Sequence, residues 1–371
     1  MDRNLDDPYA PPDGSSRDRD NRFYRILSGG ARMKLLEAYL ALGVGEAIGA
    51  SRTGTVSARD LITRLCLHPH RGWKFLHALS LVGILTETGG TYGSEEAQFA
   101  LSEDTKNFFG HDGTEGYFFR ELVAFQKYLT VDLDISLSDV VQGEKLPKRM
   151  VHWPPQTETA AKHLETWMAV TATGAVDTLL SSGCMDGAAR LLDVGGGDGT
   201  IAMAVVTAYQ SQKMTATVFN LQASADLALD NIQANGIADT VDVVVGDFLK
   251  DPLPADGAYD RVLFSRVLTD WDATTCRMLL EKAKAVLQKT KSKTGKDGRL
   301  VINEAFMEGN GDYCAAWEFR YIFYDTFGRA VYKSFETYRS ILNDIGFEIV
   351  DFSPMLDSAF YSVIQAKLMD A

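Results

Sequence analysis

The second half of this sequence predicts an α/β fold with a mostly parallel sheet, and three observations support it. After Arg190, short apolar runs alternate with helical patterns, which is typical of parallel strands joined by helices. The first run leads directly into a glycine-rich loop. The last two runs are separated only by a short polar loop, so they are expected to pair as an antiparallel hairpin at one edge of the sheet. The seven expected strands are 190–194, 215–221, 241–247, 261–268, 300–306, 347–352 and 360–367.

The N-terminal region has a different organisation. Residues 1–20 are acidic, polar and rich in Pro and Gly, and we expect a disordered tail. Residues 21–112 begin with two amphipathic helices broken at residues 28–30. Further short helices follow, and then two β runs around a Gly-Gly turn within residues 83–92. Helices followed by a β-hairpin are the outline of a winged helix.

A winged helix that binds DNA needs a basic recognition helix, and the candidate at residues 69–82 carries only Arg71 and Lys74. The sequence therefore favours dimerisation or a role in covering a substrate over DNA binding. Residues 113–182 are helical and rich in aromatic side chains, and we expect a connector that contributes to a substrate pocket. Residues 183–371 form the predicted α/β domain.

The composition excludes several classes of function. The chain has 371 residues, 46% apolar and 23% charged, and a net charge of −13 with scattered Lys and Arg. This balance argues against a nucleic-acid or anionic-membrane partner. The four cysteines form no CxxC pair, which argues against a metal site and a disulfide framework. The N-terminus lacks the basic start of a signal peptide and no apolar run is long enough to span a membrane, so we expect a cytoplasmic protein.

The loop at residues 193–199, with the sequence DVGGGDG, is the predicted cofactor site. Its glycines at Gly195 and Gly197 allow a sharp turn and a close approach to a ligand beside a helix N-terminus. The third glycine, Gly199, comes one residue too early for the dinucleotide pattern GxGxxG. Because the acid Asp193 would repel a diphosphate, the loop suits a cofactor without one, and Asp193 is expected to hold that cofactor's amino group. The plain alternative is a structural strand-to-helix turn.

Two further positions lie at the ends of predicted strands, where such a cofactor needs polar groups. Asn220 ends the second strand and is expected to face ribose hydroxyls, although an acid is more usual there. Asp247 and Phe248 end the third strand, where a carboxylate can accept the adenine amino proton while the ring packs on the base. Together with the loop, these positions predict an adenosyl cofactor.

With these motifs, residues 23–368 resemble the plant- and bacterial-type small-molecule O-methyltransferases. The loop DVGGGDG and the segments 141–144, 153–155, 218–221 and 264–268 look most like the bacteriochlorophyll C-20 and hydroxyneurosporene methyltransferases of pigment pathways. The resemblance implies a winged-helix dimerisation domain, a Rossmann-like class I methyltransferase domain, a homodimer and the cofactor S-adenosylmethionine. It also implies cofactor contacts by Leu221, Ser265 and Trp271, and a small-molecule substrate methylated on oxygen or carbon.

One departure from the family pattern bears on catalysis. The family carries a catalytic His before Asp-Trp, but here Thr269 stands in that position, and no histidine follows His163. Threonine is no base at neutral pH. The best remaining candidates are Asp270 and Glu304, although Asp270 is about equally expected to be the N-cap of the helix that begins near Asp272.

Substrate contacts are expected from aromatic and histidine side chains, each of which has an ordinary packing role as its alternative. The candidates are His152, His163 and Trp167 from the connector, and Tyr321 and Tyr324 from the segment 317–325. Two rival functions remain open at the level of sequence. One is an enzyme that binds S-adenosylmethionine but catalyses a hydroxylation or a pericyclic reaction. The other is a winged-helix regulator, which would bind DNA in a salt-sensitive way.

Overall fold

The computed structural model describes residues 24–88, 96–110, 117–128, 130, 136–143, 157–255, 259–308, 310–323, 332–355 and 360–369. The predicted tail at residues 1–20 lies outside these ranges. The chain divides into two compact units, Met1–Asp134 and Ile135–Ala371, which are described separately below. No helix in the described ranges combines the length and the apolar character needed to cross a membrane.

The first unit is mainly helical and contains one small sheet. A helical turn at residues 24–27 runs almost without interruption into the next helix, because Ser28 keeps a right-handed helical conformation. The predicted break at residues 28–30 is thus confined to Ser28. A sharper break follows at Gly43, which has a φ of +67° that favours glycine. The elements are α2 (Gly29–Ala41), α3 (Val44–Gly49), β1 (Thr55–Ser57), α4 (Ala58–Arg64), α5 (Pro69–Leu81), β2 (Leu85–Thr88), β3 (Gln98–Leu101), α6 (Glu103–Phe109) and α7 (Tyr117–Lys127).

The small sheet has the strand order β1-β3-β2, and both pairings are antiparallel. Strand β2 matches the first of the two predicted β runs, but its partner is β3 at Gln98–Leu101, and the second predicted run is not among the described residues. Residues 89–95 lie outside the described ranges. Strand and helix residues such as Phe99, Leu76 and Tyr39 share one buried core. The unit thus combines helices with antiparallel strands, and its assignment as a winged-helix dimerisation domain stays a prediction.

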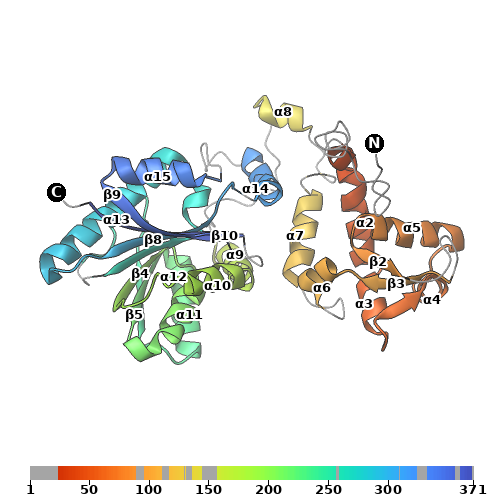
Figure 1. The fold of residues 1–371 in the computed structure, drawn as a ribbon, viewed down its shortest axis with the longest axis horizontal. Coiled ribbons are helices and arrows are strands. Elements are labelled where there is room, and N and C mark those ends of the chain that lie inside the picture. The colour runs from red at the N-terminus through yellow and green to blue at the C-terminus, as the bar shows by residue number, and fades with distance from the viewer. Residues whose placement is uncertain are drawn as a thin grey trace, which may run out of the picture. The chain divides into compact units, whose positions relative to one another are not determined.

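The second unit is built on a seven-stranded sheet with the order β6-β5-β4-β7-β8-β10-β9 (Figure 1). The first five strands in this order are parallel, whereas β10 is antiparallel to both β8 and β9. The predicted fold class and its C-terminal antiparallel hairpin are confirmed. The strands are β4 (Arg190–Val194), β5 (Thr215–Asn220), β6 (Val241–Val245), β7 (Arg261–Ser265), β8 (Arg299–Ala305), β9 (Phe347–Ser353) and β10 (Tyr361–Leu368).

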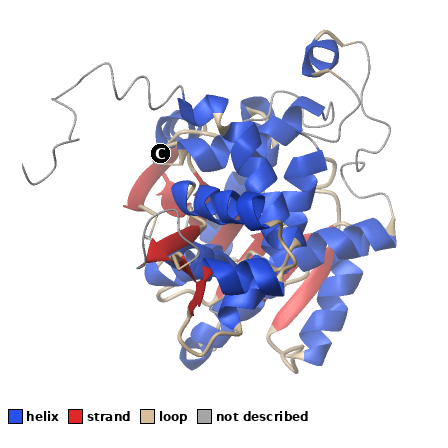
Figure 2. Cartoon of the chain, turned by 90° about the vertical axis from the view of Figure 1, so that its right-hand side faces the viewer, coloured by secondary structure: helices blue, strands red, loops and turns tan. Residues whose placement is uncertain are grey.

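Helices cover both faces of this sheet (Figure 1). Figure 2 colours the helices and strands of the chain separately. Side chains on a strand alternate between faces, so Leu191 packs with α10, α11 and α12, while Leu192 packs with α13 and α15. The helical elements are α8 (Leu137–Val141), α9 (Glu158–Val170), α10 (Thr173–Ser181), α11 (Thr200–Ala208), η2 (Gln210–Gln212), α12 (Gln222–Ala234), η3 (Leu268–Asp270), α13 (Ala273–Thr294), α14 (Gly311–Glu318), η4 (Phe319–Phe323) and α15 (Phe335–Asp344).

The predicted connector at residues 113–182 is divided between the two units. Helix α7 belongs to the first unit, whereas α8, α9 and α10 belong to the second. Helix α10 packs on β10 and α9 packs on α12. Both helices therefore lie against the domain that carries the glycine loop.

Candidate cofactor-binding and active site

A pocket of the second unit opens at the carboxyl ends of the parallel strands, which is where open α/β sheets bind ligands. Its walls come from the glycine loop, the ends of β5, β6 and β7, and one side of helix α9. All the predicted cofactor residues except Asp193 line it: Gly195, Gly197, Asn220, Leu221, Asp247, Phe248, Ser265 and Trp271. Residues from four separate strand ends thus converge on one cavity.

Asp193 lies beneath the glycine loop and outside the pocket lining. A Cβ atom on Gly196 would come within 2.5 Å of Asp193 Oδ2, so only glycine lets the loop pass over this carboxylate. The side chain is buried, and Oδ2 has no hydrogen-bond partner among the described residues. Burial raises the pKa of Asp193 to about 7. The structure thus separates Asp193 from the pocket by one layer of backbone.

The strand-end residues Asn220 and Asp247 are both held by local hydrogen bonds. Asn220 Oδ1 accepts from the amide of Leu221 at 2.8 Å, and Asn220 Nδ2 donates to the carbonyl of Gly197 at 3.4 Å. Asp247 accepts from the amide of Leu249 at 2.9 Å and pairs with Lys250 at 2.8 Å. Burial opposes ionisation of Asp247, but these bonds outweigh it and hold the pKa of Asp247 below its ordinary value.

Two aromatic rings close the end of the pocket near Asp247. Phe248 and Trp271 meet edge to face, with ring centroids 5.9 Å apart. Lys282 from α13 donates to the Phe248 carbonyl at 2.7 Å, which holds the backbone beside that ring. The rings offer an apolar surface beside a carboxylate, which suits a flat base with an amino group.

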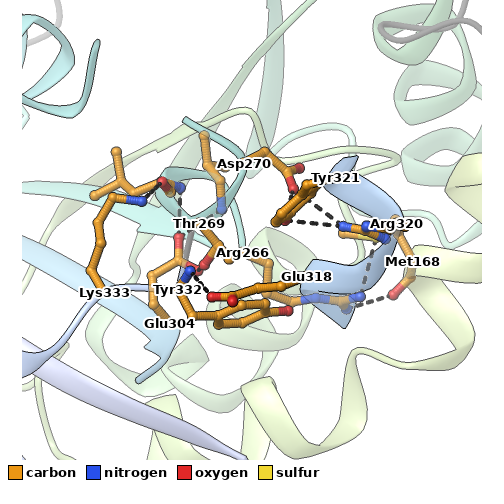
Figure 3. A network of polar contacts seen from close by, with 12 residues as sticks. Met168, Arg266, Thr269, Asp270, Glu304, Glu318, Arg320, Tyr321, Tyr332 and Lys333 are labelled. Carbon is orange, nitrogen blue, oxygen red and sulfur yellow. Dashed lines mark hydrogen bonds and ion pairs between the residues drawn. The ribbon is translucent and has the colours of Figure 1, made fainter. Parts of the chain in front are cut away.

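The turn after β7 is held by a buried carboxylate from β8 (Figure 3). Glu304 Oε1 accepts from the amides of Val267 and Leu268, both at 2.7 Å, and Glu304 Oε2 accepts from the Thr269 hydroxyl at 2.5 Å. Lys333 donates to the Leu268 carbonyl at 2.9 Å. Burial raises the pKa of Glu304 to about 7, against these stabilising hydrogen bonds. Neither Thr269 nor Glu304 is a lining residue of the pocket.

Asp270, one residue further along, does line the pocket. Its Oδ1 atom accepts from the Tyr321 hydroxyl at 2.6 Å and from the Arg320 guanidinium at 3.2 Å (Figure 3). The alternative role as a helix cap is wrong, because Asp272 caps α13 by accepting from the amide of Thr275 at 2.8 Å. Asp270 is therefore a carboxylate at the pocket wall, oriented by two donors from η4.

The substrate candidates fall in different places. Tyr321 is buried and bonds to Asp270. Trp167 meets Trp317 of α14 with ring centroids 5.3 Å apart, and His163 is exposed on α9. None of Tyr321, Trp167 and His163 is a lining residue of the pocket. His152 and Tyr324 lie outside the described residues.

Three charged side chains at the site have no counterpart among the sequence candidates: Glu165, Arg266 and Arg320. Glu165 lines the pocket from α9. Arg266, just after β7, donates to the Met168 carbonyl at 2.7 Å and to the Thr171 hydroxyl at 2.6 Å, so it ties α9 to the sheet. The φ of Arg266 is +61°, and such strain in a bulky residue tends to occur at functional sites. No local sequence pattern identifies these three residues as part of the site, because the residues they contact there are distant in sequence.

Comparison with known proteins decides the family. A model of the O-methyltransferase domain matches residues 154–348, which is more than half of the chain. The chain belongs to the O-methyltransferase family. It is 27% identical to bacteriochlorophyllide d C-20 methyltransferase of Chlorobaculum tepidum over 69% of this chain and 73% of that protein. It is 28% identical to 3-hydroxy-5-methyl-1-naphthoate 3-O-methyltransferase of Streptomyces sahachiroi over 69% of this chain and 70% of that protein.

A solved structure shares the whole fold of this O-methyltransferase. The S-adenosylmethionine-dependent methyltransferase SibL in its apo form matches with a TM-score of 0.72 and 20% identity, over 94% of this chain and 99% of that one. The predicted enzyme class, an S-adenosylmethionine-dependent methyltransferase, and its family are confirmed.

The pocket residues fit the cofactor of this family, S-adenosylmethionine. Besides the glycine cradle and the aromatic end, the lining contains four carboxylates and one guanidinium: Glu165, Asp198, Asp247, Asp270 and Arg266. An acidic lining favours a cationic ligand such as a sulfonium. A Cβ atom on Gly195 would come within 2.9 Å of Val267, so any side chain there would crowd the cradle. The adenosyl group suits the end formed by Asp247, Phe248 and Trp271.

Proposed function

We propose that this O-methyltransferase methylates an oxygen or a carbon of a conjugated small molecule in pigment or secondary metabolism, with Asp270 as its proton acceptor. The observation that carries the proposal is the position of Asp270. It is the one of the three candidate catalytic residues that lines the pocket, and Tyr321 and Arg320 orient it. The bound cofactor supplies an electrophilic methyl group on a positively charged sulfur.

Thr269 and Glu304 have a positioning role in this proposal. The Thr269 hydroxyl donates its proton to Glu304, so towards any substrate it offers only lone pairs that can accept a hydrogen bond. Glu304 accepts from two successive amides and from Thr269. It therefore holds the turn that presents Asp270.

Loss of the histidine base is compatible with methyl transfer on energetic grounds. Positioning of two reactants supplies roughly 7 to 11 kcal/mol, whereas a general base typically adds about 10²- to 10⁴-fold in rate, or about 3 to 5 kcal/mol. Positioning is the larger contribution. A nucleophile that is already activated, such as an acidic phenol or an electron-rich ring carbon, has the least need of a strong base.

Aromatic side chains packed around Arg320, the guanidinium partner of Asp270, support a conjugated substrate. Trp317 contacts Trp167 and lies beneath the Arg320 guanidinium, 5.0 Å from ring centroid to Cζ. Tyr313 stacks on Phe360 with ring centroids 4.3 Å apart. The substrates named for the two relatives, a bacteriochlorophyllide and a hydroxynaphthoate, are themselves conjugated ring systems. We propose Trp167 and Tyr321 as substrate contacts of this chain, with His152, His163 and Tyr324 as further candidates.

The test is incubation with S-adenosylmethionine carrying a deuterated methyl group, together with a panel of phenols, hydroxynaphthoates and chlorin pigments. We expect one product that is heavier by one labelled methyl group and an equal amount of S-adenosylhomocysteine. Mass fragmentation then assigns the methyl group to oxygen or carbon. A substrate that is consumed without release of S-adenosylhomocysteine would instead establish a hydroxylase or pericyclase, and binding of the cofactor with no turnover of any substrate would also contradict the proposal.

We further infer a homodimer formed through the first unit, located in the cytoplasm. Large apolar side chains are exposed near the start of that unit, with Ile26 75% and Leu27 62% exposed. Clustered exposed apolar side chains favour a protein interface. All four cysteines are free thiols, which is compatible with a reducing compartment.

A further inference from the structure

Helix α9 brings a buried carboxylate to the glycine loop. Glu165 is only 6% exposed and lines the pocket. A Cβ atom on Gly197 would lie 2.6 Å from Glu165 Oε2, so the carboxylate rests directly against the loop. Glu165 Oε1 accepts from the Ser224 hydroxyl at 2.5 Å, in the first turn of α12. Glu165 therefore lies between the loop and the helix that follows β5.

Within the described ranges, no Lys or Arg side chain forms an ion pair with Glu165. The positive charge of Arg266 acts on Glu165, but the hydrogen bonds of Arg266 go to Met168 and Thr171, at the C-terminal end of α9. Burial raises the pKa of Glu165, and the hydrogen bond from Ser224, a hydrogen bond from the backbone of Asp198 and the positive charge of Arg266 only partly offset this effect. A buried carboxylate without an ion pair is costly to the fold, and a ligand that donates hydrogen bonds to it would reduce this cost.

The same corner of the pocket holds Asn220, the strand-end residue that faces the ribose in the predicted site. The Asn220 amide is already engaged, because Oδ1 accepts from Leu221 and Nδ2 donates to Gly197. A ribose offers two neighbouring hydroxyl groups as donors, and the usual strand-end acid accepts from them as a carboxylate. Asn220 provides no such charge. Gly197 contacts both side chains, since Asn220 bonds its carbonyl and Glu165 lies against its Cα.

We propose that Glu165 binds the ribose hydroxyls of the cofactor and thereby supplies, from α9, the acid that the end of β5 lacks. The carboxylate accepts hydrogen bonds from the hydroxyl groups while Ser224 holds it in place. Asn220 braces the loop through Gly197 and adds neutral contacts. The proposal rests on S-adenosylmethionine as the cofactor, and not on the identity of the methyl acceptor.

The test compares two ligands by calorimetry, S-adenosylhomocysteine and its 2′,3′-dideoxyribose analogue. We expect Glu165→Gln to weaken binding of S-adenosylhomocysteine by about 10- to 100-fold, as for the loss of a charge-assisted hydrogen bond. The same substitution should leave the affinity for the dideoxy analogue unchanged. Because the ligands differ only in the hydroxyl groups, general damage to α9 would lower both affinities equally. Glu158→Gln, an exposed position on the same helix, is the matched control and should alter neither affinity.

A double variant tests whether the affinity depends on a carboxylate near the ribose and not on Glu165 itself. Adding Asn220→Asp to Glu165→Gln returns a carboxylate to the strand end, and we expect most of the lost affinity for S-adenosylhomocysteine to return. Equal losses on both ligands, or no loss on either, would overturn the inference. The inference would also be overturned if Glu165→Gln weakened binding of every ligand except an analogue of S-adenosylhomocysteine that lacks the amino group. Glu165 would then bind the ammonium group of the cofactor. Wild-type protein that binds no S-adenosylhomocysteine would overturn the cofactor assignment itself.

Discussion

Asp270 is the residue on which the proposed chemistry depends most, and its removal gives the most direct test. We expect Asp270→Asn to lower kcat by roughly 10²-fold or more for an oxygen acceptor, because the proton acceptor is lost. The affinity for S-adenosylhomocysteine should change little. Single-turnover kinetics and calorimetry measure the two effects separately. Asp272→Ser, which keeps a capping oxygen on α13, is the control two residues away. An Asp270→Asn enzyme with wild-type kcat would show that Asp270 takes no part in the reaction.

Asp193 predicts a pH dependence of stability. In the unfolded chain it ionises near 3.8, whereas in the folded chain burial keeps it protonated up to about 7. Folding therefore takes up a proton between these values, and the stability this contributes is complete below about pH 4 and is lost as the pH rises to about 7. Glu304, with its pKa raised to about 7, has the same sign.

We expect Asp193→Asn to stabilise the ligand-free protein at pH 8 by about 1 to 3 kcal/mol, because it removes an uncompensated buried charge. It should also flatten the decline in stability between pH 4 and pH 7. Urea unfolding at pH 5 and pH 8 measures both effects, with the exposed Asp242→Asn as the control. A less stable variant at pH 8 would contradict this account. A carboxylate kept at such a cost to stability is typical of a functional site.

At the scale of elements, the pocket depends on the attachment of α9 to the sheet. Arg266 makes that attachment through a forked pair of hydrogen bonds to Met168 and Thr171. Lysine keeps the charge but not the fork. A positive φ destabilises lysine and arginine to the same extent. The effect of Arg266→Lys therefore reports the loss of these hydrogen bonds.

We expect Arg266→Lys to speed hydrogen exchange across α9 and to raise the Kd for S-adenosylhomocysteine about tenfold, the equivalent of one lost charged hydrogen bond. Hydrogen-exchange mass spectrometry and calorimetry provide the measurements. Arg277→Lys, at an exposed ion pair with Asp344, is the control. Unchanged exchange in residues 158–170 would show that other contacts hold the helix.

For two helices, local sequence signals placed the boundary imprecisely. The helix break expected at residues 28–30 is confined to Ser28, because Gly29 and Gly30 lie in the first turn of α2, and a sharper break falls at Gly43. The cap of α13 is Asp272 and not Asp270, because its oxygen reaches the Thr275 amide. Propensities place a boundary only to within a few residues, and the hydrogen bonds that form decide among neighbouring candidates.

At the scale of the whole molecule, the dimer is the principal prediction. If the first unit forms the interface, light scattering should give twice the mass of one chain. Replacing the exposed Ile26 and Leu27 by Asp should reduce this to a single chain, because two buried charges replace apolar contacts. Exposed Val244 and Val245 on β6 of the second unit provide the control pair. A dimer that survives the first double substitution would place the interface elsewhere.

The sequence by itself determined the layered α/β domain, the glycine loop and the set of strand ends around it. These features are encoded locally, since strand and helix periods, glycine spacing and the proximity of the last two strands each lie within a short stretch of chain. Only the tertiary structure decided that Asp193 lies behind Gly196, that Asp270 faces the pocket while Glu304 does not, and that Glu165 and Arg266 join α9 to the site. The partners of these residues are far away in the chain, and packing of separate elements brings them within hydrogen-bond distance.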